Sequence, residues 1–288
     1  MNTETQIFKE FNWQVPKIVA SIAQGEDAKS LYETLNQEIE ANYKNNPNMR
    51  ILSYDSETKS LVGSNIFIAS RLSELLELSG IRTAIPSDDQ YGDISRLVKD
   101  RFYTDFNALI LRTAGDSYSP NDKIAKDLAE KIENREGKLK LPVVIVRPLV
   151  RYSEGSSSYD LVFDLDNKTQ VIEDERLDGK KYPTGMKFNN VDDLGLPLFD
   201  KNGARTWHAR EDGLSRLLLD GYLDLGSCVD DLQLSDVLDR VVVVSGKAAS
   251  RNFSGLESYI SGIQAEKAKE IKTIESRYEE ALKILKGN

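Results

Sequence analysis

The sequence predicts an α/β fold: a mostly parallel sheet with flanking helices, an antiparallel β extension, and helical N- and C-terminal segments. Two observations carry this prediction. Short aliphatic or β-branched runs recur at residues 50–54, 81–85, 108–112 and 142–146, and turn-forming residues follow them. Stretches of helical period lie between these runs. Alternation of strands and helices is typical of a parallel sheet that is covered on both faces.

Three apolar stripes predict the helices between these strands. The first is rich in leucine (Leu72, Leu75 and Leu76) and ends before Gly80, a residue type that commonly caps helices. The second is short and centres on Leu97. The third starts near Pro120, a favoured residue in a first helical turn, and repeats every four residues as Ile124, Leu128 and Ile132.

Both ends of the chain have helical periodicity. In residues 1–49, apolar residues at spacings of three and four predict one helix interrupted by Pro16 and a second that ends before Pro47. In residues 254–288, a similar repeat predicts a C-terminal helix, formed by Ile271, Ile274, Tyr278, Ala281 and Leu285. This helix either packs across the domain or pairs with a second copy.

The passage between the alternating core and the C-terminal helix reads as β-rich. Residues 159–164 alternate like a half-exposed strand, residues 168–173 form its expected hairpin partner, and residues 240–245 form a buried strand. The predicted organisation is therefore an N-terminal helical segment (1–49), an α/β core (50–147), a β-rich extension or second subdomain (148–253) and a C-terminal helix (254–288).

Composition excludes several classes of partner. The net charge of −9 and the pI near 5.0 argue against nucleic acid and against anionic lipid. No apolar run reaches the roughly 18 residues that a membrane-spanning helix needs. The first residues lack the basic and apolar regions of a secretory signal, so we expect cytoplasmic residence.

Single-copy residues limit the chemistry further. Cys228 is the only cysteine and His208 the only histidine, so neither an intrachain disulfide nor a multi-histidine metal site can form. We therefore assign no metal site from the sequence, and we interpret these residues as an inert thiol and as a surface or hydrogen-bonded imidazole. Acid–base chemistry, if present, would rest on carboxylates, tyrosine or lysine.

Three loops that follow predicted strands carry aspartate beside a hydroxyl residue. In a parallel sheet such loops meet at one edge, where ligands commonly bind. Carboxylates and hydroxyls there suit a hydroxylated or nucleotide-like ligand, although the same residue types also cap turns. The candidate ligand-binding residues are Asp55, Ser56, Ser87, Asp88, Asp89, Asp116 and Ser117.

The usual phosphate-binding signatures are missing from the sequence. No G-x-G-x-x-G motif follows a predicted strand. Residues 241–247 look like a strand that enters a P-loop, but that motif requires glycine in place of Val241 and serine or threonine in place of Ala248. The sequence therefore identifies no cofactor.

An acidic cluster offers a weaker alternative. Asp164, Asp166, Glu173 and Asp174 surround the expected hairpin, and the first three could hold the metal ion of a nuclease. They lack the spacing of a known cation loop, and solvated hairpin charge also explains them.

Three functions thus remain open: binding of a small ligand at the strand-end loops, non-enzymatic assembly through the terminal helices, and metal-dependent nuclease activity. The expected partners are a small molecule, or a second copy or another protein that contacts the terminal helices. Catalytic residues are not assigned, and whether the protein is an enzyme is left open.

Two passages resemble uncharacterised proteins from small archaeal genomes. One is the stretch 205–245, with Gly-Leu-Ser-Arg-Leu followed by Arg-Val-Val-Val-Val-Ser; the other runs in pieces from Ile81-Arg82-Thr83-Ala84-Ile85-Pro86 to Phe106-Asn107-Ala108-Leu109. The resemblance implies no activity and transfers no site residue.

Overall fold

The computed structural model describes residues 20–22, 25–76, 81–82, 103–137, 139–192, 194–220, 222, 224–235 and 238–245. All of them belong to one compact unit, Met1–Ala248, whereas the second unit, Ala249–Asn288, lies outside the described residues. The described part contains three α-helices: α1 (Gly25–Asn42), α2 (Ile66–Leu76) and α4 (Ser119–Glu136). It is otherwise mostly β.

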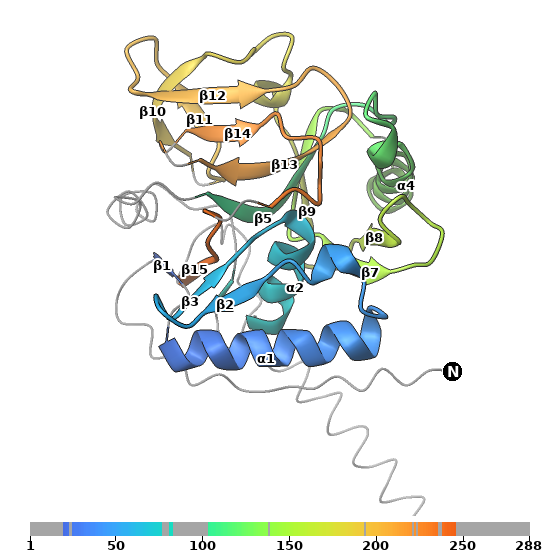
Figure 1. Cartoon of the computed structure of the whole chain (residues 1–288). Coiled ribbons are helices and arrows are strands. Elements are labelled where there is room, and N and C mark those ends of the chain that lie inside the picture. The colour runs from blue at the N-terminus through green and yellow to red at the C-terminus, as the bar shows by residue number, and fades with distance from the viewer. Residues whose placement is uncertain are drawn as a thin grey trace, which may run out of the picture. The chain divides into compact units, whose positions relative to one another are not determined.

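A curled eight-stranded sheet is the largest element of this unit (Figure 1). Its order is β11-β10-β12-β14-β13-β5-β6-β9, and every described pairing except that between β12 and β14 is antiparallel. The strands are β5 (Thr104–Leu111), β6 (Val143–Val146), β9 (Gln170–Glu173), β10 (Lys187–Val191), β11 (Pro197–Phe199), β12 (Arg205–Ala209), β13 (Leu214–Leu219) and β14 (Leu225–Ser227).

Smaller sheets complete the β structure. Strands β2 (Ser53–Asp55) and β3 (Ser60–Val62) form a hairpin, and β7 (Leu149–Tyr152) pairs with β8 (Leu161–Asp164). A three-stranded antiparallel sheet consists of β1 (Ala20–Ile22), β15 (Val242–Ser245) and β4 (Ile81–Arg82). The 3₁₀ turns η1 (Pro47–Met49) and η4 (Glu175–Leu177) connect elements at the surface of the unit.

Strand β5 is buried along its whole length because the large sheet carries a hydrophobic core on each face. Successive side chains of a strand point to opposite faces. Accordingly, Leu109 and Leu111 join the core formed with the helices, whereas Phe106 and Ile110 join a second core around Trp207. Burial on both faces explains why the second half of β5, residues 108–111, is entirely apolar.

The helices pack on one face of this arrangement. Helix α1 buries its stripe of Leu31, Leu35 and Ile39, and α4 buries Ile124 and Leu128. Helix α2 is buried on nearly all sides, so its Arg71 is neutralised internally: the Arg71 Nη1 donates to Glu74 Oε2 at 2.7 Å and its Nε donates to Glu38 Oε2. The helices predicted around Leu35, Leu72 and Leu128 are therefore confirmed.

The predicted mostly parallel sheet with flanking helices is wrong. Two of the four predicted core strands, β5 and β6, are antiparallel neighbours in the large sheet. The other two belong elsewhere: β2 pairs only with β3 among the described strands, and β4 pairs with β15. Strand–helix alternation misled the prediction because it is a local pattern, whereas pairing partners are set by contacts between distant residues.

The remaining predicted strands and helices are confirmed in some parts of the chain and wrong in others. The predicted hairpin of 159–164 with 168–173 is wrong, because β8 pairs with β7 and β9 pairs with β6. The strand predicted at 240–245 is confirmed as β15. Residues 20–22, at the end of the first predicted N-terminal helix, form a strand; the helix around Leu97 and the C-terminal helix lie outside the described residues.

The described strands between residues 148 and 245 belong to three sheets. Strands β9 to β14 join β5 and β6 in the large sheet, β7 and β8 pair with each other, and β15 pairs with β1 and β4. The four-part domain division stays a prediction. The large sheet crosses the predicted boundary between residues 147 and 148, because it contains strands from both sides.

Within the part of the chain that the structure describes, no helix combines the length and apolar composition needed to cross a membrane.

Candidate metal centre

Three potential metal ligands meet where strand β12 passes the β13–β14 hairpin. Asp220 directly follows β13 and Asp224 directly precedes β14, so the antiparallel pairing of Leu219 with Leu225 brings the two carboxylates together. Strand β14 runs parallel to β12, and His208 is in register with Gly226. Because Trp207 points into the second core, His208 points to the opposite face of the sheet.

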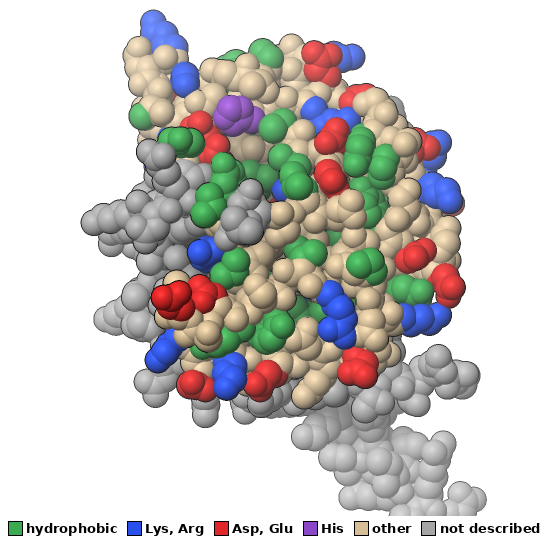
Figure 2. All heavy atoms as spheres, viewed as in Figure 1, with side chains coloured by type: hydrophobic (Ala, Val, Ile, Leu, Met, Phe, Trp, Pro, Cys, Tyr) green, Lys and Arg blue, Asp and Glu red, His purple; other side chains and the backbone are tan. Residues whose placement is uncertain are grey.

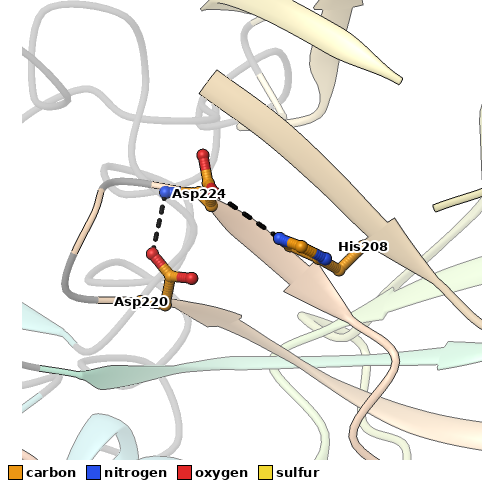
Figure 3. Close-up of side chains that lie close together, drawn as sticks. All are labelled: His208, Asp220 and Asp224. Atoms are coloured by element: carbon orange, nitrogen blue, oxygen red, sulfur yellow. Dashed lines mark hydrogen bonds and ion pairs between the residues drawn. The ribbon is translucent and has the colours of Figure 1, made fainter. Parts of the chain in front are cut away.

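The geometry of the group suits a single cation. One donor atom from each of His208, Asp220 and Asp224 lies within 4.8 Å of the others, and the side chains face a common space (Figure 3). The His208 Nε2 is 3.5 Å from Asp224 Oδ2. Metal–ligand bonds of about 2.0–2.2 Å place neighbouring donors roughly 3–4 Å apart, so a small closure of the group would complete the site.

Backbone amides hold the two carboxylates in place. The Asp220 Oδ1 accepts hydrogen bonds from the amides of Tyr222 at 2.8 Å and Asp224 at 3.0 Å. The Asp224 Oδ1 accepts one from the amide of Thr206, on β12. Each aspartate is thus anchored through one oxygen, which leaves the other oxygen for a ligand. Such outer hydrogen bonds orient the carboxylates of metal sites.

The charge of this group is unbalanced. Burial raises the pKa of Asp220, and the nearby Asp224 carboxylate raises it further. Within the described part of the chain, neither carboxylate forms an ion pair with lysine or arginine. A divalent cation would supply the missing positive charge. Carboxylate oxygen and imidazole nitrogen together are typical ligands of Zn²⁺, Mn²⁺ and Fe²⁺.

Asp55 and Ser56 lie in the β2–β3 hairpin. The Asp55 carboxylate accepts hydrogen bonds from the Thr58 hydroxyl at 2.6 Å and from the Glu57 amide at 2.8 Å, and these bonds lower its pKa. Ser56 is exposed. Asp55 therefore stabilises its own turn in this structure.

Asp116 and Ser117 follow β5. The Asp116 side chain is fully buried, and it accepts hydrogen bonds from the amides of Tyr118 and Leu214 and from Arg210. The Ser117 hydroxyl donates to Asp212 at 3.1 Å. These contacts tie the loop after β5 to the start of β13.

Only some of the predicted ligand-binding residues can be placed in the fold. Asp55 is the last residue of β2, in the small β2–β3 sheet, whereas Asp116 lies in the loop after β5 of the large sheet. Ser87, Asp88 and Asp89 lie outside the described residues. Ligand binding by these residues stays a prediction. The parallel sheet that was expected to bring them together is not present among the described residues.

The acidic cluster of the nuclease alternative has cationic partners. Asp164 pairs with Lys131 at 2.7 Å, Asp166 with Arg147 at 2.7 Å and Glu173 with Lys140 at 3.3 Å. Asp174 pairs with Arg176. Compared with Asp220 and Asp224, these carboxylates have their charge balanced within the protein.

Sequence reasoning missed the metal-ligating group. Its local signal is an aspartate at each end of a short loop, 220–224, between the apolar runs that become β13 and β14. The missing step was the pairing of β14 with β12, which brings in His208. The imidazole contacts Asp224, and Cys228 is exposed and free.

Fold and site together define a β-rich protein with a candidate mononuclear metal centre at the edge of a strand hairpin. Comparison with protein-family models, curated proteins and solved structures finds no match for this chain. The resemblance to proteins of small archaeal genomes therefore stays a prediction.

Proposed function

We propose that this protein binds a divalent transition-metal ion through His208, Asp220 and Asp224. The observation that carries the proposal is the convergence of three donor atoms within 4.8 Å on carboxylates that have no lysine or arginine partner in the described residues. Zn²⁺ and Mn²⁺ fit a mixed nitrogen and oxygen donor set, whereas Mg²⁺ and Ca²⁺ prefer oxygen alone. We also propose that the protein is cytoplasmic, as expected from its sequence.

The alternatives drawn from the sequence stay predictions. They are a small hydroxylated or nucleotide-like ligand at the strand-end loops, assembly through the terminal helices, and a metal-dependent nuclease. The metal proposal differs from the nuclease alternative in its ligands, so the same binding assay can separate the two.

Metal binding is measured by titrating Zn²⁺ into the chelator-treated protein by calorimetry, with thermal unfolding as a second readout. Binding to the folded state stabilises it by about 2.7 kcal/mol at a free ion concentration one hundred times Kd. We expect one ion per chain, and we expect His208→Gln, Asp220→Asn and Asp224→Asn each to lose at least about tenfold in affinity, since each removes a ligand.

The matched control is Asp164→Asn, which removes a carboxylate that already pairs with Lys131. It should bind Zn²⁺ like the wild type. The proposal fails if the wild type binds no ion, or if His208→Gln and Asp224→Asn bind as tightly as the wild type. Loss of binding in Asp164→Asn alone would favour the nuclease alternative.

A further inference from the structure

We infer that the metal ion in this centre keeps coordination positions open to solvent, and that a neutral hydroxyl-bearing ligand, such as a vicinal diol or an α-hydroxycarbonyl group, binds there. This inference rests on the proposed metal site and names the class of ligand that the bound ion would take. Three features of the site support it.

The first feature is incomplete protein coordination. Among the described residues, the group contains three ligating side chains and no fourth histidine, cysteine or acidic residue. Zn²⁺ and Mn²⁺ take four to six ligands, and sites with three protein ligands commonly complete their coordination with water or substrate. The His208 side chain is 33% exposed and that of Asp224 18%, so water can reach the ion. Figure 2 shows the imidazole at the surface, beside carboxylate atoms.

The second feature is the charge of the loaded site. Two aspartates and a neutral imidazole would cancel the double positive charge of the ion. In the described part of the chain, no lysine or arginine pairs with Asp220 or Asp224. Protein sites for phosphate and carboxylate groups use such cations. The neutral loaded site therefore attracts a phosphate dianion only weakly in this protein of net charge −9. Binding of a neutral oxygen donor does not depend on this attraction.

The third feature is an exposed aromatic residue in the same loop. Tyr222 lies between the two aspartates, its amide donates to Asp220 Oδ1, and it is 66% exposed. An aromatic ring offers a flat apolar surface with a polar tip. Such a surface suits the apolar face of a sugar or another polyol whose hydroxyls reach the ion.

Mn²⁺ tests the inference directly, because this paramagnetic ion accelerates the relaxation of the protons of the water molecules that it coordinates. The full-length protein is loaded with Mn²⁺, free ion is quantified by electron paramagnetic resonance, and the longitudinal relaxation of water protons is measured. Ribose, mannitol or inorganic phosphate is then titrated in. Methanol and 2-propanol serve as monohydroxy controls for solvent effects.

We expect bound Mn²⁺ to enhance water relaxation, and we expect the diols, but neither phosphate nor the monohydroxy alcohols, to reduce this enhancement in a saturable manner. Tyr222→Ala should weaken diol binding by about tenfold with the Mn²⁺ affinity unchanged. Tyr222→Phe, which keeps the ring, should bind diols like the wild type.

Three results would overturn the inference. They are bound Mn²⁺ without relaxation enhancement, which means a closed coordination sphere; displacement of water by phosphate but not by diols; and enhancement that no diol reduces. Failure of Mn²⁺ to bind is detected separately by the free-ion signal, and failure of both Mn²⁺ and Zn²⁺ to bind rejects the metal centre itself.

Discussion

Asp220 shows how a single residue at the candidate site affects stability. Burial and the neighbouring Asp224 raise its pKa, so the folded chain takes up this proton at a higher pH than the unfolded chain does. At neutral pH, the ionised carboxylate of the metal-free protein therefore opposes folding. As pH falls from above the raised pKa to below the ordinary value, this unfavourable contribution disappears.

We expect Asp220→Asn to raise the melting temperature of the chelator-treated protein at neutral pH. The amide oxygen of asparagine can still accept from the Tyr222 and Asp224 amides, while the charge is lost. The difference from the wild type should shrink at low pH and reverse in excess Zn²⁺. Calorimetric scans at several pH values, with and without Zn²⁺, measure it; a lower melting temperature of the metal-free variant at neutral pH contradicts it.

Gly213 occupies a position where the backbone conformation and the close approach of Asp116 both require glycine. Its φ is +66°, and an added Cβ would lie 2.3 Å from the Asp116 carboxylate carbon. Gly213→Ala therefore combines left-handed strain with a clash against a buried side chain. We expect it to cost about 2–4 kcal/mol of unfolding free energy, measured by urea denaturation.

Gly155 is the matched control for that substitution. Its φ of +71° is similar, but nothing lies within 4 Å of the added Cβ. Gly155→Ala should cost only about 1–2 kcal/mol, the backbone part of the effect. Equal costs at the two glycines would show that the contact with Asp116 contributes nothing.

At the scale of elements, a buried ion pair connects two neighbouring inner strands of the large sheet, β13 and β5. The Arg216 Nη1, on β13, donates to Asp105 on β5 at 2.9 Å, and both side chains are almost fully buried. Burial raises the pKa of Asp105, and Arg216 counters this effect in part. The pair thus joins strands at a point where the register between them shifts.

Arg216→Met should cost about 3–5 kcal/mol, because it leaves the Asp105 carboxylate buried without its cation. The loss should shrink as pH falls, since protonation neutralises a carboxylate whose pKa is then raised further. Urea denaturation across pH measures both effects. The double variant Asp105→Leu with Arg216→Met should recover most of the stability, because it removes both charges. A pH-independent loss would contradict this account.

Local patterns predicted the three described helices and several of the strands, whereas the pairing of the strands depends on contacts between distant residues. The stripes of α1, α2 and α4 lie within single helices, so their periodicity was sufficient. No local pattern of this kind indicates whether β6 runs parallel or antiparallel to β5. After α4, residues 137–142 can span about 20 Å. This length allows the chain to return to the end of β5, where Val143 pairs with Leu111.

The same limit applies to the candidate site at the scale of the whole molecule. Asp220 and Asp224 are close in sequence, and their hairpin was within reach of pattern analysis. His208 joins them only through the parallel pairing of β12 with β14, which no local motif indicates. Conversely, Asp55 and Asp116 were grouped by an assumed parallel sheet, and the observed pairing separates them.

The compact unit Met1–Ala248 contains both hydrophobic cores and the candidate metal centre. We therefore expect a chain that ends at Ala248 to keep the melting temperature and the Zn²⁺ affinity of the full-length protein.

Light scattering of the two chains also tests assembly through the predicted C-terminal helix. A full-length oligomer that becomes a monomer on truncation supports that assembly, and equal masses reject it for this helix. A lower melting temperature of the shorter chain at equal mass would instead mean that residues 249–288 stabilise the fold within one molecule.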